Sequence, residues 1–232
     1  MEDLDYAGNV NYWTDRWAQE KTGWHRSNVS RQLIENLPKL CDNVVSKTFF
    51  IPLCGKTVDI PYLYAQGHKV FGVEAVAKPI EELNEEHSLG LKFDAASSTY
   101  ATDDGGIVIY CGDIFTCPFE KYGPFDCVWD RASFIAFEYA FRPAYSEMMQ
   151  RSLKVKKEGA TGEYHNFKYL METLEYDREQ FSGPPRATDA SDMDTFFGSF
   201  ANYEIVNREP DTLKALPDLK VEVVHYFLTP KQ

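Results

Sequence analysis

The chain has 232 residues, of which 44% are hydrophobic and 15% aromatic, and its formal net charge is −12. This length suits one large α/β domain spanning residues 1–232, and the composition is that of a globular protein rather than a disordered or fibrous one. The negative charge excludes the broad basic surface with which proteins neutralise phosphates. We therefore expect no nucleic-acid partner.

The N-terminal segment MEDLDYAGNV lacks a basic region and an apolar run, and no stretch approaches the ~20 apolar residues of a membrane span. We expect a cytoplasmic protein with no membrane partner. The five cysteines form no CxxC pair, which argues against a zinc site and a disulfide framework. We expect no metal, and thiols that are reduced and mostly buried.

Short apolar, β-branched runs alternate with helical patterns, which is typical of a mainly parallel sheet covered by helices on both faces. Two helices are predicted before the first strand, at 9–20 and 28–37. The next elements are predicted in this order: strand 48–53, helix 57–66, strand 69–74, helix 78–88, strand 106–112, strand 125–130 and helix 140–153. The polar segment DAASSTYATDDGG, 94–106, is predicted to be a surface loop.

The last three predicted strands are 167–176, 201–209 and 221–229, which makes seven in all. Only the connection PDTLKALPDLK, which contains proline, separates the last two strands. Because this connection leaves no room for a helix, it predicts an antiparallel hairpin. A parallel sheet that ends in such a hairpin departs from the plain doubly wound pattern of dinucleotide dehydrogenases.

The segment PLCGKTVDIPYLYAQGHKVFGVE, 52–74, leads from the first strand through the second. In open α/β sheets, ligands bind at the carboxyl ends of the strands. Gly55 lies in a turn before a helix whose first N–H groups are free to bind an anion or a polar ligand. Glu74 ends the second strand 19 residues later, where a carboxylate accepts hydrogen bonds from ribose hydroxyls. The pair indicates a nucleoside site, and the alternative is an ordinary turn glycine and a charged strand end.

The third and fourth strands also end in polar residues. Asp113, followed by Ile114, is placed to accept a hydrogen bond from an adenine amino group while the aliphatic side chain covers the ring. The alternative is a helix N-cap at Asp113. Asp130 and Arg131 end the fourth strand at the same rim, where the arginine suits a carboxylate. The alternative there is a structural Asp130–Arg131 pair.

Three of the four tryptophans precede the first strand, in YWTDRWAQEKTGWH. Trp13 and Trp17 are four residues apart and share a helix face, whereas Trp24 lies beyond the helix. This concentration favours a helical lid, residues 9–37, over the strand ends. The alternative is a set of core aromatic residues.

Six strings of this sequence, in this order, resemble the thiopurine S-methyltransferase family of S-adenosylmethionine-dependent class I methyltransferases. They are YWTDRW…TGWH, FFIPLCGKTVDIPYLYAQGHKVFGVE, GDIF, FDCVWDRASFIAF, LEYD and SGPP. The resemblance runs from about residue 11 to the C-terminus. It implies a Rossmann-like α/β fold with a seven-stranded, mostly parallel sheet, a C-terminal antiparallel hairpin and helices on both faces.

The resemblance also implies a site for S-adenosylmethionine, which becomes S-adenosylhomocysteine, and a small thiol as acceptor. Arg131 would act electrostatically near the methionine portion and the reacting centre, and Trp24 would face the acceptor. The residues implied to bind the cofactor are Trp13, Arg16, Trp17, Leu53, Gly55, Glu74, Asp113, Ile114 and Arg131. One glycine is enough in the first turn, because this cofactor has no pyrophosphate to hold.

The sequence departs from the family pattern at two places. Mammalian members that accept thiopurines have an arginine between the last two strands, whereas this connection offers only lysines. The residue after SGPP is usually aromatic in the family and is Arg186 here. We hypothesise that Arg186 supplies a cation at the mouth of the acceptor site.

Methyl transfer to a thiolate needs alignment rather than an enzyme nucleophile. The acceptor is therefore expected to be an aromatic or heterocyclic thiol, with sulfide or selenium species as alternatives. A nicotinamide-dependent oxidoreductase is disfavoured because the segment has no GxGxxG. A catalytically idle cofactor-binding protein is the remaining alternative, and we expect the chain to be a monomer.

Overall fold

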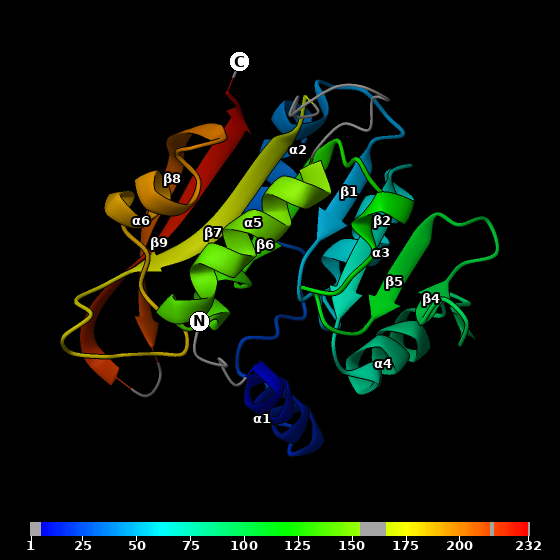
Figure 1. Cartoon of the computed structure of the whole chain (residues 1–232), viewed down its shortest axis with the longest axis horizontal. Helices are drawn as coiled ribbons and strands as arrows, with labels where there is room; N and C mark the ends of the chain where they lie inside the picture. The colour runs from blue at the N-terminus through cyan, green and yellow to red at the C-terminus, as the bar shows by residue number, and fades with distance from the viewer. Residues whose placement is uncertain (1–5, 154–165, 214–215, 232) are drawn as a thin grey trace. The chain divides into compact units, whose positions relative to one another are not determined.

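The computed structural model describes residues 6–153, 166–213 and 216–231. The chain forms two compact units, the first ending at Pro118 and the second beginning at Phe119. Figure 1 shows the elements of both units in chain order. The single domain and the lid over residues 9–37 stay predictions.

The first unit contains four helices and five strands among its described residues. They are α1 Tyr6–Ala18, α2 Arg31–Cys41, β1 Thr48–Ile51, α3 Asp59–Ala65, β2 Lys69–Glu74, α4 Ala77–His87, β3 Lys92–Asp94, β4 Thr99–Ala101 and β5 Ile107–Cys111. The strands follow the order β3-β4-β5-β2-β1. β1, β2 and β5 run parallel to one another, whereas β3 and β4 are antiparallel to their neighbours.

The parallel strands form where the sequence is apolar without interruption. In β2, KVFGVE, every residue after Lys69 is buried, as expected of a strand covered on both faces. Helix α2, which precedes β1, is capped at its N-terminus by Ser30, whose side chain accepts a hydrogen bond from Leu33 N. It ends at Asp42, which adopts the left-handed conformation that stops helices.

The prediction of a surface loop over 94–106 is wrong in part, because β4 lies inside this segment and β3 ends at its first residue. Both strands are three residues long, and β3 is exposed throughout. Such short strands have no apolar alternation from which the sequence could indicate them. The predicted count of seven strands therefore rises to nine in the described residues.

The second unit contains three short 3₁₀ helices, two α-helices and four strands among its described residues. They are η1 Phe119–Lys121, β6 Cys127–Arg131, η2 Phe134–Ala136, η3 Tyr139–Phe141, α5 Arg142–Leu153, β7 Lys168–Glu175, α6 Ala190–Phe196, β8 Ala201–Leu213 and β9 Leu216–Pro230. The strands follow the order β6-β7-β9-β8. β6 and β7 are parallel, and β9 is antiparallel to β7 and β8.

The predicted antiparallel hairpin is confirmed, but its strands extend into the expected connection. β8 runs to Leu213 and β9 starts at Leu216, with register shifts at 205–207 and 211–213. Lys214, one of the lysines of this connection, lies outside the described residues. Helix α6 was not predicted, although Asp189 and Asp192 form a capping box at its start.

No helix in the part of the chain that the structure describes is long and apolar enough to span a membrane. Four of the five cysteines are buried, as predicted, and Cys111 is half-buried. The predicted α/β fold, with parallel strands, helices and a final antiparallel pair, is confirmed.

Candidate functional site

The turn after β1 has an unusual backbone. Leu53 and Gly55 have φ values of 41° and 51°, which lie in the left-handed region. A positive φ is uncommon for a residue with a side chain and occurs often at functional sites. A Cβ atom on Gly55 would lie 3.0 Å from Cζ2 of Trp17. Glycine therefore meets two requirements here, the backbone conformation and the close approach of the indole.

Glu74, at the end of β2, is joined to this turn by a hydrogen bond. Gly55 N donates to Glu74 Oε2, and Val76 N donates to Oε1, each at 2.9 Å. Burial raises the pKa of Glu74 to about 7, although backbone N–H donors act in the opposite direction. The structure thus brings the Gly55 turn and the Glu74 carboxylate into direct contact.

The three N-terminal tryptophans form one cluster, as Trp24 folds back onto the helix. The ring centroid of Trp24 lies 5.0 Å from that of Trp13 and 5.7 Å from that of Trp17, both edge to face. The Arg16 guanidinium lies 5.4 Å from the Trp24 centroid, a cation–π distance. Trp17 is 4% exposed. Trp17 therefore has a core position against Gly55, and Trp13 and Trp24 form the more accessible part of the cluster.

Asp113 and Ile114 follow β5 at the edge where Glu74 ends β2. Glu74 is paired with Cys111, so Asp113 comes two residues beyond that pair. The Asp113 carboxylate accepts a hydrogen bond from Phe115 N at 2.8 Å, and Ile114 is fully buried. No α-helix begins at Asp113 in the described chain, so the N-cap alternative is wrong. The Asp113 side chain instead forms an Asx turn with Phe115 N, and its second oxygen can accept from another donor.

Arg131 ends β6 in the second unit, and its largely buried Nε lies 3.5 Å from Glu172 Oε1. Its neighbour Asp130 does not lie at the rim, which corrects the prediction. Asp130 is fully buried and accepts hydrogen bonds of 2.6 Å from the hydroxyls of Tyr145 and Tyr169. Adjacent side chains on a strand point to opposite faces, so an Asp130–Arg131 pair does not form.

Arg186 is held by several contacts of its own. Its backbone N donates to Ile135 O at 2.8 Å, and its Nη1 donates to Ala136 O at 2.8 Å. Its Nη2 lies 3.4 Å from Oε1 of the exposed Glu138. The guanidinium is therefore fixed in place rather than free on a surface.

Sequence reasoning missed the residue that supports this segment, Arg142. Its side chain is fully buried, 3.1 Å from Asp192, and it donates to Ala187 O at 2.9 Å. Its guanidinium also lies 4.4 Å from the ring centroid of Phe134. Arg142 is the first residue of α5 and also donates to Arg186 O, 44 residues later in the chain. Because the two residues are so far apart in sequence, no local pattern indicates this contact.

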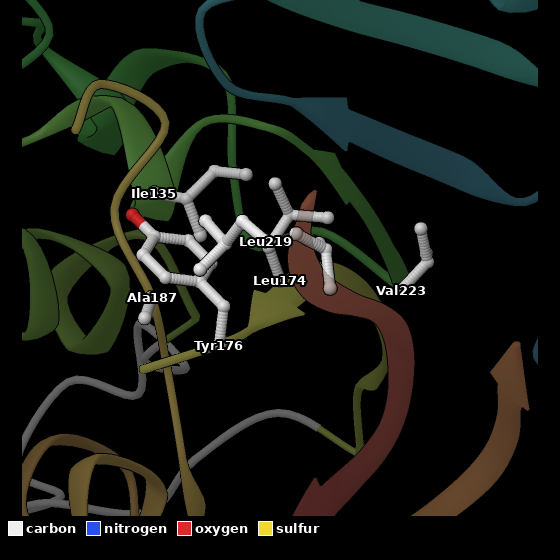
Figure 2. Close-up of a cluster of buried hydrophobic side chains, with 7 residues drawn as sticks. Ile135, Leu174, Tyr176, Ala187, Leu219 and Val223 are labelled. Carbon is white, nitrogen blue, oxygen red and sulfur yellow. The ribbon is translucent and has the colours of Figure 1, made fainter. Parts of the chain in front are cut away.

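An apolar cluster lies in the second unit, and it includes or contacts the residues that follow Arg131 and Arg186 in the chain. Ala132, which follows Arg131, packs against it, and Ala187, which follows Arg186, is part of it. Ala132 has φ 65°, again the left-handed region. Figure 2 shows the side chains of Ile135, Leu174 and Leu219 gathered beside Tyr176. The full cluster is Ile135, Leu174, Tyr176, Ala187, Leu219, Val221 and Val223.

A family model described as "Thiopurine S-methyltransferase (TPMT)" matches residues 9–228. The chain is 31% identical to a probable thiopurine S-methyltransferase of Danio rerio, over 87% of this chain and 85% of that protein. It is 31% identical to a thiopurine S-methyltransferase of Bordetella petrii, over 86% of each chain.

Solved structures with the same fold have much lower identity. The 1,6-didemethyltoxoflavin-N1-methyltransferase of Burkholderia thailandensis, solved with S-adenosylhomocysteine, has a TM-score of 0.63 at 12% identity, over 97% of this chain and 89% of that one. The N-methyltransferase NodS of Bradyrhizobium japonicum, also solved with S-adenosylhomocysteine, has a TM-score of 0.60 at 10% identity, over 96% and 100%. These likenesses confirm the predicted Rossmann-like class I methyltransferase fold.

Proposed function

Because the chain belongs to the thiopurine S-methyltransferase family, it is an S-adenosylmethionine-dependent methyltransferase, and we propose that its acceptor is a small aromatic or heterocyclic thiol. The observation that carries this proposal is that the backbone segments bearing two cations, Arg131 and Arg186, adjoin the apolar cluster. Ala132, which follows Arg131 in the chain, packs against that cluster, and Ala187, which follows Arg186, is part of it. A flat apolar ring with an anionic sulfur matches both features.

The first unit offers residues that fit the cofactor. Glu74 presents a carboxylate that can accept from the ribose hydroxyls, and Asp113 has an oxygen that can accept from the adenine amino group. The turn at Leu53 and Gly55 exposes backbone to a methionine chain without the glycine-rich loop that a pyrophosphate needs. We propose that these residues bind the cofactor together with Trp13, Arg16, Trp17, Ile114 and Arg131.

When bound, S-adenosylmethionine supplies a methyl group that its sulfonium already activates. The protein's own contribution is then alignment, which is worth roughly 7–11 kcal/mol when the reacting atoms are well oriented. Arg131 favours the thiolate form of the acceptor, because a nearby cation lowers the pKa of a thiol. Trp24 faces the acceptor, and the aromatic faces of the tryptophan cluster stabilise positive charge nearby.

The function is tested by a panel of thiols, including thiophenols and thiopurines, assayed for S-adenosylhomocysteine release. Turnover of aromatic thiols is the expected result. Turnover of sulfide or selenium species alone would move the acceptor to the alternative class. A protein that binds the cofactor and methylates none of these compounds would be an idle binder, and calorimetric binding of NAD alone would contradict the cofactor.

Arg186 is proposed to bind the acceptor anion. Replacing it with alanine should raise the Michaelis constant for thiols by about tenfold, the usual loss for one charged contact. Arg208→Ala is the matched control, because Arg208 is also an ion-paired arginine of the second unit and its partners are Glu175 and Glu222. Equal Michaelis constants for the Arg186 variant and the natural protein would remove Arg186 from the acceptor site.

A further inference from the structure

Four polar side chains lie in one row across the strands of the second unit. Arg131 on β6 is paired with Glu172 on β7, Glu172 with His225 on β9, and His225 with Asn207 on β8. Directly opposed residues on neighbouring strands are close enough to interact through their side chains. The row begins at the arginine that is proposed to act on the acceptor and ends in the hairpin.

Glu172 lies between two basic groups, and each of its oxygens faces one of them. Oε1 is 3.5 Å from Arg131 Nε, and Oε2 is 3.1 Å from His225 Nε2. The exposed fractions of the Arg131 and Glu172 side chains are 13% and 11%, and that of His225 is 1%. A buried ion pair is stable only when further hydrogen bonds satisfy its polar atoms. His225 provides such a bond to Glu172.

With Nδ2 of Asn207 facing the ring, the contacts of His225 place a proton on one ring nitrogen. Nδ1 lies 3.4 Å from Asn207 Nδ2, and an amide nitrogen only donates. Nδ1 therefore accepts, so the proton is on Nε2, which donates to the carboxylate of Glu172. The amide orientation of Asn207 and this tautomer follow together from the hydrogen-bond network.

A β-bulge in β8 brings Asn207 to this position. Ile205 is paired with Tyr226, whereas the next pair joins Asn207 to His225, so Val206 is an extra residue in the strand. Bulges re-aim side chains and are frequent beside active sites. Without the bulge, Val206 rather than Asn207 would lie opposite His225. Nδ1 of His225 would then face an apolar side chain that has no donor.

We propose that Glu172, His225 and Asn207 are positioning residues that hold the Arg131 guanidinium in one orientation toward the acceptor. This inference rests on the proposed function of Arg131. An arginine side chain has many rotamers, and ordering it in advance avoids an entropic cost when the acceptor binds. Asn207 orients the imidazole, the imidazole orients the carboxylate, and the carboxylate attracts the guanidinium as an ion pair 3.5 Å from Nε.

The test compares two substitutions of His225. In His225→Leu the donor to Glu172 is lost, and kcat/KM for the thiol should fall by about tenfold, a typical coupling between contacting residues. In His225→Gln the side-chain amide keeps a donor for Glu172 and an acceptor for Asn207, so most of the loss should be recovered. Tyr226→Phe, next on the same strand with its side chain on the opposite face, is the control and should keep kcat/KM unchanged.

A double-mutant cycle with Arg131→Ala separates positioning from general stability. In the Arg131→Ala background, His225→Leu should cost no further kcat/KM, because there is no guanidinium left to hold. An equal loss in both backgrounds would overturn the proposal. If Arg131→Ala itself retained full kcat/KM, the proposed role of Arg131 and its positioning would both be wrong. If Arg131→Ala lost activity while His225→Leu did not, positioning alone would be wrong.

A measurement without activity completes the test and does not depend on whether a variant folds. ¹⁵N NMR of the histidines in the unmodified protein should show that Nε2 of His225 carries a proton and that Nδ1 accepts from Asn207. An Nδ1-protonated ring would contradict the proposed order of donors and acceptors.

Discussion

Glu74 shows at the scale of one residue how burial at a strand end changes the chemistry of a carboxylate. Glu74 is 7% exposed, and burial outweighs its backbone hydrogen bonds to raise the pKa of the carboxyl group from the ordinary 4.5 to about 7. A raised pKa in the folded state means that Glu74 stabilises the fold below its ordinary pKa. This contribution is lost as the pH rises through about 7. The ionised group then carries a desolvation cost that additional donors would relieve.

A proton should accordingly be released from Glu74 when S-adenosylhomocysteine binds at a pH near or below the pKa of this residue. Two ribose hydroxyls favour the ionised carboxylate, so S-adenosylhomocysteine should bind more weakly as the pH falls below about 7. Calorimetry at about pH 6 in buffers of different ionisation heat measures this release, which should vanish near pH 9 and in Glu74→Gln. Equal binding heats in all buffers at the lower pH would place the ribose elsewhere.

β9 shows at the scale of an element that adjacent residues of a strand have different roles, because their side chains alternate between the two faces of the sheet. His225 on one face joins the row of polar side chains, and Tyr226 on the other face is fully buried. Among the described residues, the Tyr226 hydroxyl has no hydrogen-bond partner. Burial of this unpaired hydroxyl also raises the pKa of Tyr226 to about 12. A polar atom in this state destabilises the fold.

Tyr226→Phe should therefore stabilise the protein by about 1 kcal/mol, because it removes an unsatisfied hydroxyl and keeps the ring. Tyr169→Phe on β7 is the matched comparison, since the Tyr169 hydroxyl donates to the buried Asp130 at 2.6 Å. That variant should be less stable than the natural protein, by about 1–3 kcal/mol. Chemical denaturation measures both, and a destabilised Tyr226→Phe would mean that its hydroxyl has a partner in solution.

At the scale of the whole molecule, the single-domain prediction and the proposed cofactor residues both imply that the chain unfolds as one unit. The proposed residues come from both halves of the sequence, from Trp13 to Arg131, so ligand binding should stabilise all of the chain.

Calorimetric unfolding should thus show one transition, and S-adenosylhomocysteine should raise its midpoint. A ligand at about 100 times its Kd stabilises a folded protein by about 2.7 kcal/mol. NAD should give no shift, and Glu74→Ala should reduce the shift with S-adenosylhomocysteine. Two separate transitions, only one of which moves with ligand, would show that the single-domain prediction is wrong.

The sequence by itself determined the elements whose apolar pattern is long and unbroken. β2 was predicted to the residue, and so was the position of the turn that contains Gly55 after the first strand. These features depend on neighbours in the chain, and local patterning records them. Family membership was also readable, because it rests on strings of adjacent residues.

Only the tertiary structure decided which distant side chains meet. Asp130 and Arg131 are adjacent in sequence, yet one is buried with Tyr145 and the other pairs with Glu172. Glu172 and His225 are 53 residues apart and look like ordinary polar positions in two strands. Their contact depends on strand order and on a bulge, and both are set by the packing of the whole sheet rather than by any local pattern.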